Sequence, residues 1–128
     1  MLRECLAIAA GGAIGSLARY ALTVLFSLLG GTWLPIATLT ANAVGCLAIG
    51  WLAQWSIQQE ATNHWGVIGV RVGLLGGLTT FSTFAIDVLR LWQTDRVGFS
   101  ILLTLAHLVI GFGCVAIGIS LARQLVAT

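Results

Sequence analysis

A stretch beyond the middle of the sequence gathers the residue types best suited to hold a small ion. Residues 73–84 read Gly-Leu-Leu-Gly-Gly-Leu-Thr-Thr-Phe-Ser-Thr-Phe, a glycine pair followed by hydroxyl groups and two phenylalanine rings. Glycine loosens a helix and lets other groups approach its backbone, while threonine and serine offer hydroxyl donors. Because the segment is hydrophobic enough to lie inside a bilayer, where water is scarce, we expect it to hold a small ion.

An amide and two aromatic rings indicate which sign that ion has. Asn42 falls inside a second apolar segment, where an amide often forms only a hydrogen bond between helices, and that explanation stays open. Phe81 and Phe84 are three residues apart and so share a helix face, which alone indicates ordinary packing. Ring edges carry partial positive charge, however, and together with the hydroxyls and the amide they suit a small anion.

Three ionisable residues also fall inside apolar segments. Arg19 has a stem long enough to carry its guanidinium to the lipid headgroups, although a role in drawing anions toward a vestibule stays open. We expect Asp87 to pair with Arg19 or Arg90 rather than to transfer protons. For His107 we expect a neutral imidazole bonded to a neighbouring helix, with a proton relay as the alternative.

The elements that must position these groups are membrane-spanning helices. The chain has 128 residues, of which 59% are hydrophobic and 8% charged, whereas a soluble domain is about 25% charged. A spanning helix needs roughly 20 apolar residues, so the length allows four spans in a single transmembrane domain over residues 1–128. We therefore predict an all-α membrane protein with spans at residues 4–29, 35–56, 65–92 and 97–126.

The third span is too long to be one straight helix. Its residues 65–92 would make about 42 Å of helix against a hydrocarbon core of about 30 Å. We expect a break at Gly76-Gly77. Tryptophans support the layout, because Trp55 and Trp65 flank one loop while Trp33 and Trp92 flank the opposite ends.

The positive charges give no clear orientation signal. The six arginines divide evenly between the two sides of the four-span arrangement: Arg3, Arg71 and Arg123 toward the termini, and Arg19, Arg90 and Arg96 toward the other side. Since an excess of positive charge normally decides which side stays in the cytoplasm, such a chain can insert in either direction. We therefore predict dual topology and an antiparallel homodimer.

Other function classes fit the sequence poorly. Cys5, Cys46 and Cys114 lack the spacing of a zinc site or disulfide framework, so we interpret them as packing residues. Without paired carboxylates, a nucleophile beside a base or a phosphate loop, we expect neither an enzyme nor a nucleic acid partner. The alternative is a proton-coupled small multidrug-type transporter, but that needs a carboxylate centred in the first span, and neither Glu4 nor Asp87 lies there. A structural subunit without transport activity is a further alternative.

Over essentially its whole length the sequence resembles the Fluc/CrcB family of fluoride channels. Three stretches carry the resemblance: Gly-Gly-Ala-Ile-Gly-Ser-Leu-Ala-Arg-Tyr at 11–20, Thr-Ala-Asn-Ala-Val-Gly at 40–45, and Gly-Gly-Leu-Thr-Thr-Phe-Ser-Thr-Phe at 76–84. The resemblance implies an antiparallel dimer of dual-topology subunits in a bacterial plasma membrane. It also implies two pores that passively export fluoride and so lower its toxic concentration in the cytoplasm.

The resemblance further implies a set of ion-binding residues. A structural sodium ion, not transported, would lie at the centre of the dimer on the backbone carbonyls of Gly76 and Thr79 from both subunits. By the same resemblance, the residues that line the fluoride pores would be Asn42, Phe81, Ser82, Thr83 and Phe84, with Arg19 near the pore entrance. On the fourth span, where some relatives place a tyrosine and a serine or threonine, this chain offers Thr104, His107 and Cys114.

Overall fold

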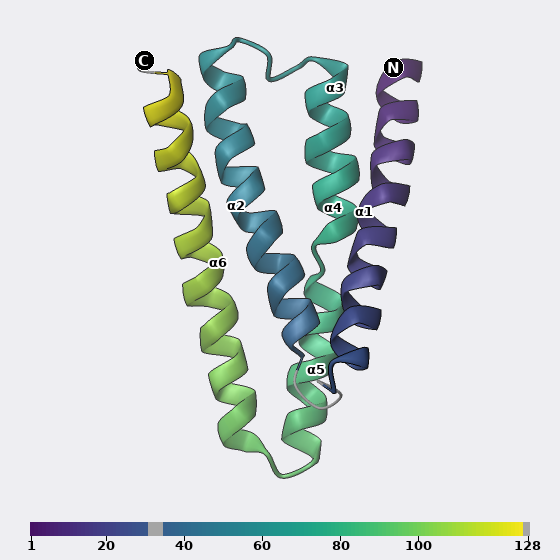
Figure 1. Cartoon of the computed structure of the whole chain (residues 1–128), viewed down its shortest axis with the longest axis vertical. Coiled ribbons are helices and arrows are strands. Elements are labelled where there is room, and N and C mark those ends of the chain that lie inside the picture. Colours follow the sequence, from purple (N-terminus) through teal and green to yellow (C-terminus); the bar gives the residue numbers. More distant parts are fainter. Residues whose placement is uncertain (31–34, 127–128) are drawn as a thin grey trace.

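The computed structural model describes residues 1–30 and 35–126, and every long element within those ranges is a helix. Four rods lie side by side, with both chain ends at the same end of the bundle (Figure 1). Their helices are α1 (Leu2–Leu28), α2 (Ile36–Gln58), the segmented third rod of α3 (Trp65–Ile68), η1 (Gly69–Leu74), α4 (Leu75–Leu78) and α5 (Phe81–Gln93), and α6 (Val97–Val126). Trp33, named above as flanking the ends of two spans, lies outside the described residues.

Each rod is long and apolar enough to cross a membrane. The candidate spans are Leu2–Leu28, Ile36–Gln58, Trp65–Gln93 and Val97–Leu125, with mean hydropathies from 1.4 to 2.3. A multi-pass, all-α membrane protein with four spans is thereby confirmed.

The third rod is interrupted, as its length requires, but not at the glycine pair. Gly76 and Gly77 lie within α4, and the break falls at Thr79 and Thr80. Thr79 has φ −81° and ψ 153°, and Thr80 has φ −153° and ψ 118°, so both are extended. The expected position was wrong because the break depends on a hydrogen-bond partner from α2. Gly77 serves a different purpose, since it lets α1 pass closely: a Cβ at Gly77 would lie 2.7 Å from the carbonyl oxygen of Gly12.

Two glycines, which have no side chain beyond a hydrogen atom, allow two close helix contacts. A Cβ on Gly15 of α1 would collide with the carbonyl oxygen of Leu74 in the third rod. A Cβ on Gly118 of α6 would collide with the carbonyl oxygen of Leu47 in α2. Small residues let membrane helices approach backbone to backbone, where dispersion contacts replace the hydrophobic drive that lipid does not supply. The bundle is thus two close pairs, α1 with the third rod and α2 with α6, which lie beside each other in Figure 1.

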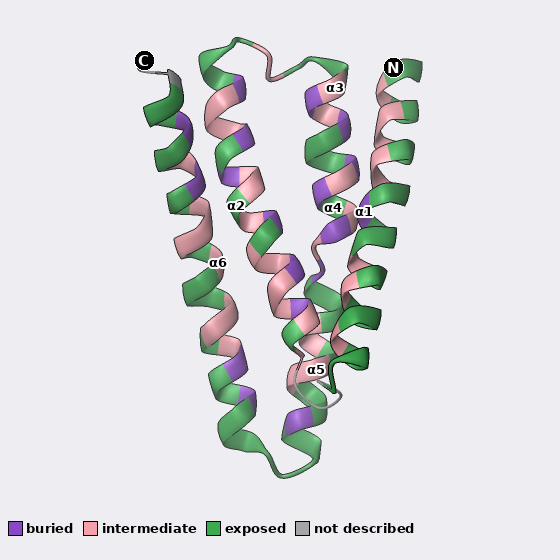
Figure 2. Cartoon of the chain, in the orientation of Figure 1, coloured by how far each residue is buried: buried purple, intermediate pink, exposed green. Residues whose placement is uncertain are grey.

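Much of the apolar surface of one copy is uncovered. Figure 2 shows exposed residues along most of α1, whose one buried residue is Gly15. The side chain of Phe81 is 78% exposed, directly beside the break. Apolar faces of this size suit lipid or a second protein surface.

Candidate functional site

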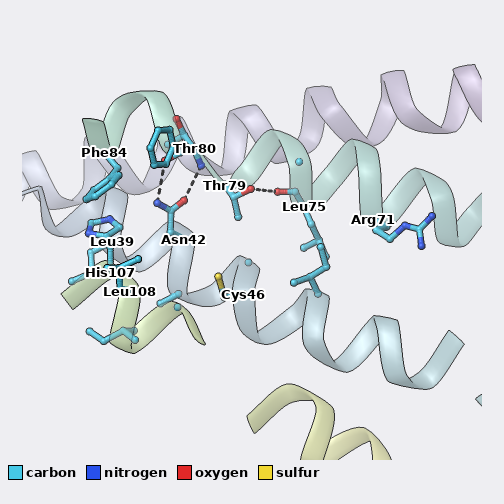
Figure 3. Close-up of a pocket in the computed structure, with 17 residues that line it drawn as sticks. Leu39, Asn42, Cys46, Arg71, Leu75, Thr79, Thr80, Phe84, His107 and Leu108 are labelled. Atoms are coloured by element: carbon cyan, nitrogen blue, oxygen red, sulfur yellow. Dashed lines mark hydrogen bonds between the residues drawn. The ribbon is translucent and has the colours of Figure 1, made fainter. Parts of the chain in front are cut away.

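The break in the third rod is held by a single side chain of α2. The Nδ2 of Asn42 donates to the carbonyl oxygen of Thr80 at 3.1 Å, and its Oδ1 accepts from the backbone N–H of Thr80 at 2.7 Å (Figure 3). An extended residue inside a membrane rod loses its helical partners, and leaving such groups unpaired costs about 1–3 kcal/mol each. Asn42 supplies both missing partners. Its second amide hydrogen makes no hydrogen bond within the described residues and is left for another acceptor.

The hydroxyl group of Thr80 organises the start of α5. Its Oγ1 accepts from the backbone N–H of Thr83 at 3.1 Å and donates to Thr83 Oγ1 at 3.1 Å. Because that donation uses its one hydrogen, the 3.1 Å contact with Ser82 Oγ must have Ser82 as the donor. The hydrogen of Ser82 is therefore committed, whereas the hydroxyl hydrogen of Thr83 makes no hydrogen bond to any described residue.

A cavity of about 410 Å³ opens beside the break, between α2, the third rod and α6. Asn42 and Phe84 line it (Figure 3). Phe81 lines it too, so the cavity holds the amide and both rings expected to face the anion. Gly76, Thr79 and Thr80 complete the wall formed by the break. The structure thus brings the amide, the rings and the free backbone of the break to one place.

Aromatic groups form a short stack on one side of this cavity. The ring centroids of Phe81 and Phe84 are 5.5 Å apart with planes at 59°, which turns the edge of one ring toward the other. The Phe84 centroid lies 4.3 Å from that of His107 on α6, with planes at 36°. Of the three candidates on the fourth span, His107 lines this cavity, whereas Thr104 and Cys114 do not.

The imidazole of His107 bonds to its own helix rather than to a neighbouring one, so that expectation was wrong. Its Nδ1 lies 3.0 Å from the carbonyl oxygen of Leu103, one turn earlier on α6. The role of His107 stays open from the sequence because its contact with Phe84 depends on the register between α5 and α6. No local pattern of the fourth span reveals that register.

Arg19 and Thr83 lie in a second, smaller cavity. This cavity has about 220 Å³ and is also lined by Ser16, Tyr20, Thr23, Thr38 and Thr80. The Nε of Arg19 is buried and has no hydrogen-bond partner among the described residues. Thr80 belongs to the walls of both cavities, so it separates Arg19 from Asn42 and the rings. Ser82 lines neither cavity.

Asp87 takes part in a hydrogen bond rather than an ion pair. The Oγ1 of Thr38 on α2 donates to its Oδ2 at 3.1 Å. Within residues 1–30 and 35–126 it makes no ion pair with Arg19 or Arg90, so the expected pairing was wrong. The reason is again a partner from α2, which the local sequence around Asp87 does not indicate.

The two carbonyls assigned to sodium are both released by the break. In a continuous helix the Gly76 carbonyl would accept from the N–H of Thr80, but that N–H is bound to Asn42. The Thr79 carbonyl would accept from the N–H of Thr83, which instead donates to Thr80 Oγ1. Gly76 is also exposed, with nothing within 4 Å of the position a Cβ would take. Free carbonyl oxygens are the ligands that hard cations prefer, so these residues fit such an ion.

Known proteins match nearly the whole length of the chain. Residues 6–119 match the model of the CrcB-like protein family, described as Camphor Resistance (CrcB). A relative in Paracoccus denitrificans is 36% identical over 127 residues, covering 99% of this chain and 100% of the relative. A relative in Geobacter metallireducens is 38% identical, covering 93% and 96%, and one in Synechocystis is 38% identical, covering 97% and 95%.

All three relatives carry the name fluoride-specific ion channel FluC, which agrees with the expectation that the chain is not an enzyme. The break lies within the matched residues 6–119. So do the amide clamp, meaning the two hydrogen bonds from the Asn42 amide to Thr80, and the cavity lined by the phenylalanine rings. Because the matches cover nearly the whole chain, the chain belongs to the CrcB/FluC family of fluoride channels.

Proposed function

We propose that this chain forms a fluoride-specific channel through which the anion leaves the cytoplasm passively. The observation that carries the proposal is the uncommitted amide hydrogen of Asn42, which shares one cavity with the rings of Phe81 and Phe84. A small, strongly hydrated anion enters a narrow path only where short-range donors replace its water. An amide hydrogen and positive ring edges are such donors, and they leave no net charge that would trap the ion.

The second cavity supplies the approach to this path. Arg19 contributes a buried Nε and Thr83 a hydroxyl hydrogen, and neither has a hydrogen-bond partner in the part of the chain that the structure describes. In our proposal fluoride first meets these two donors and then passes the Thr80 wall toward Asn42. Ser82, whose hydrogen is already donated to Thr80, orders this cluster without contacting the ion.

No coupled energy source is required for export. Neutral hydrogen fluoride crosses lipid, ionises at cytoplasmic pH and leaves its anion inside. A membrane potential then drives the anion out with about 2.3 kcal/mol per charge per 100 mV. A conductive pore is therefore enough to lower the fluoride concentration in the cytoplasm.

The assembly we propose is an antiparallel homodimer of dual-topology subunits. The even division of six arginines supports insertion in both directions. Phe81, 78% exposed in one copy, and the exposed Gly76 lie where the partner would cover the break. A sodium ion held there by the Gly76 and Thr79 carbonyls of both copies would join the subunits through four oxygens.

The test is ion efflux from liposomes that contain the purified protein. Fluoride that leaves alone builds up a membrane potential, which stops further efflux. We therefore expect efflux once the ionophore valinomycin lets potassium leave with the fluoride, and we expect chloride to be retained. Loss of both ions at equal rates, or of neither, would contradict the proposal. A reporter fused to the C-terminus tests the topology separately: activity on one side of the membrane only would rule out dual insertion.

A carboxylate-driven transporter finds no support in the geometry. The larger cavity is lined by no aspartate or glutamate among the described residues, and Asp87 lies outside it. Its Oδ2 already accepts from Thr38. A proton-coupled exchanger needs a carboxylate inside its binding cavity, so we propose the channel alone.

A further inference from the structure

Arg71 is a charged residue inside a membrane span that has no partner within its own subunit. It lies six residues into the span Trp65–Gln93, so its backbone is roughly 9 Å deeper than that of the interfacial Trp65. Its side chain is exposed, and its guanidinium makes no ion pair or hydrogen bond within residues 1–30 and 35–126. A charge at this depth is costly in lipid, so such side chains normally face a water-filled cavity and mark ion pathways.

The packing of η1 decides which way Arg71 faces. Gly69 and Gly73, two residues before and after it, lie against α1: a Cβ on Gly69 would be 2.7 Å from the Cβ of Ala7, and one on Gly73 would be 2.5 Å from the carbonyl oxygen of Ile8. Residues two apart on a helix point in different directions, so Arg71 faces away from α1. The turn itself is π-helical, a rare form that frequently occurs at functional sites.

Arg71 lines the larger cavity, at the end away from the phenylalanine rings. On the third rod, Arg71, Leu75, Gly76 and Thr79 form the cavity wall that leads from η1 to the break. Figure 3 shows Arg71 and Phe84 at opposite ends of the lining residues. Among the described residues that line this cavity, Arg71 is the one arginine, lysine, aspartate or glutamate. No described lining residue therefore offsets its positive charge with a carboxylate.

An unpaired charge at the mouth of a cavity attracts ions of the opposite sign. Low-dielectric walls focus its field into the water of the cavity, which raises the local concentration of a small anion. Arg19 lies beyond the Thr80 wall, in the smaller cavity. The fluoride path would thus have a guanidinium toward each end, with the uncharged donors of Asn42 and the rings between them. Charge at the ends helps the anion to enter, and weak binding between them lets it leave.

We propose that Arg71 forms a second anion-collecting mouth, on the side of the chain termini, which speeds the entry of fluoride into the larger cavity. This inference rests on the proposed fluoride channel and deepens it. Arg71 lies eight residues from Thr79, roughly 12 Å along the rod, so it acts on the ion at the break through its field and not through a hydrogen bond. It changes how fast the anion enters, whereas the selection of fluoride over chloride stays with the narrow part.

The experiment measures single-channel fluoride current in bilayers of uncharged lipid. Sodium fluoride is held at about 0.1 M on both sides, and N-methylglucamine gluconate then raises the ionic strength to about 1 M, which shortens the Debye length from about 10 Å to about 3 Å. Both added ions are too large for the path. We expect Arg71→Gln to lower the current about twofold at the lower ionic strength and by less than about 1.3-fold at the higher one.

A series of charges at this position separates a field from a hydrogen bond. Arg71→Lys keeps the charge but loses the planar guanidinium, and it should conduct like the wild type. Arg71→Glu should lower the current about twofold below Arg71→Gln, because each substitution changes the charge by one unit. In the proposed antiparallel dimer one Arg71 lies toward each face of the membrane, so the currents in the two directions should fall equally.

Arg3 is the control for the loss of a positive charge on the same side of the membrane. It lies at the start of α1 and lines neither of the two cavities. Arg3→Gln should leave the current unchanged at both ionic strengths. Since the Arg71 guanidinium has no partner in its own subunit, Arg71→Gln should keep the fold, and cross-linking of the purified variant to a dimer checks this.

Failure of the inference and failure of the channel proposal look different. If the wild type carries no fluoride, the proposed function is wrong. If it carries fluoride and Arg71→Gln conducts equally well at the lower ionic strength, the guanidinium reaches the lipid headgroups instead and the role of Arg71 is wrong. A loss that persists at about 1 M, or that Arg71→Lys shares, would also overturn the inference, because screening by salt removes the effect of a field.

Discussion

The side-chain amide of Asn42 binds both backbone groups of Thr80, with the two bonds at 3.1 and 2.7 Å. One residue of α2 therefore holds the gap between α4 and α5 open. The same clamp removes the helical partner of the Gly76 carbonyl, and it leaves one amide hydrogen facing no acceptor among the described residues. The shape of the break and the proposed cation and anion sites thus depend on this one side chain.

Asn42→Asp tests the amide directly. The new carboxylate can still accept from the Thr80 N–H, but it cannot donate to the Thr80 carbonyl, and its charge repels an anion. We expect fluoride efflux to fall at least about 100-fold and stability to fall by about 1–3 kcal/mol, the cost of one unpaired carbonyl. Efflux assays and thermal unfolding of the purified protein measure both effects.

Gln54 offers the matched control for this charge change on the same helix. Its Oε1 accepts from Arg123 at 3.4 Å, away from both cavities. Gln54→Glu places a carboxylate beside an arginine and should leave efflux unchanged. Equal losses in the two variants would show that a new charge on α2, rather than the clamp, is responsible.

Phe81→Ile tests the ring edge. Because the Phe81 side chain is 78% exposed in one copy, its removal should hardly disturb the packing within a subunit. The variant loses the positive ring edge and the 5.5 Å contact with Phe84, so we expect efflux to fall at least about tenfold, the effect of 1.4 kcal/mol. Phe112, 75% exposed on α6 and outside the larger cavity, is the control: Phe112→Ile should conduct normally.

How far the sequence predicts this structure depends on whether a feature is local. Hydropathy predicts the four rods, because burial in lipid acts on each segment by itself. The excess length of the third span predicts a break, and its glycine pair indicates the wrong place for it, because the deciding partner of Thr80 comes from Asn42, 38 positions earlier. The pairing expected for Asp87 fails for the same reason, since Thr38 lies 49 positions away.

The candidate site shows the same division. The chemistry of Asn42, Phe81 and Phe84 gathers them into one hypothesis before any geometry is known, and the structure brings them to one cavity. The resemblance to the family groups Ser82 with Thr83, because both are hydroxyl residues in the same motif. Only the hydrogen bonds of Thr80 distinguish them, since the single hydrogen of each hydroxyl can be donated once.

Ser82→Ala and Thr83→Val should therefore differ. Ser82→Ala removes a hydrogen already donated to Thr80, so we expect less than about a twofold change in efflux. Thr83→Val removes the free donor of the smaller cavity while keeping the shape of the side chain, and efflux should fall about tenfold, the effect of one lost hydrogen bond. The opposite order would show that the hydroxyl directions differ when fluoride is present.

Removal of sodium tests the carbonyl site without any substitution. The Gly76 and Thr79 carbonyls have lost their helical partners to the Asn42 and Thr80 side chains, so a cation that binds them favours the folded dimer. A ligand at 100 times its dissociation constant adds about 2.7 kcal/mol of stability. We expect the unfolding temperature and the dimer fraction to fall when sodium is replaced by N-methylglucamine at constant ionic strength, and to recover as sodium is added back.

Potassium is the sharper comparison, because it has the same charge and screens surface charges equally. If potassium or the organic cation supports the dimer as well as sodium does, the carbonyls of the break do not form a sodium site, and the contact between the subunits must come from the exposed apolar faces alone.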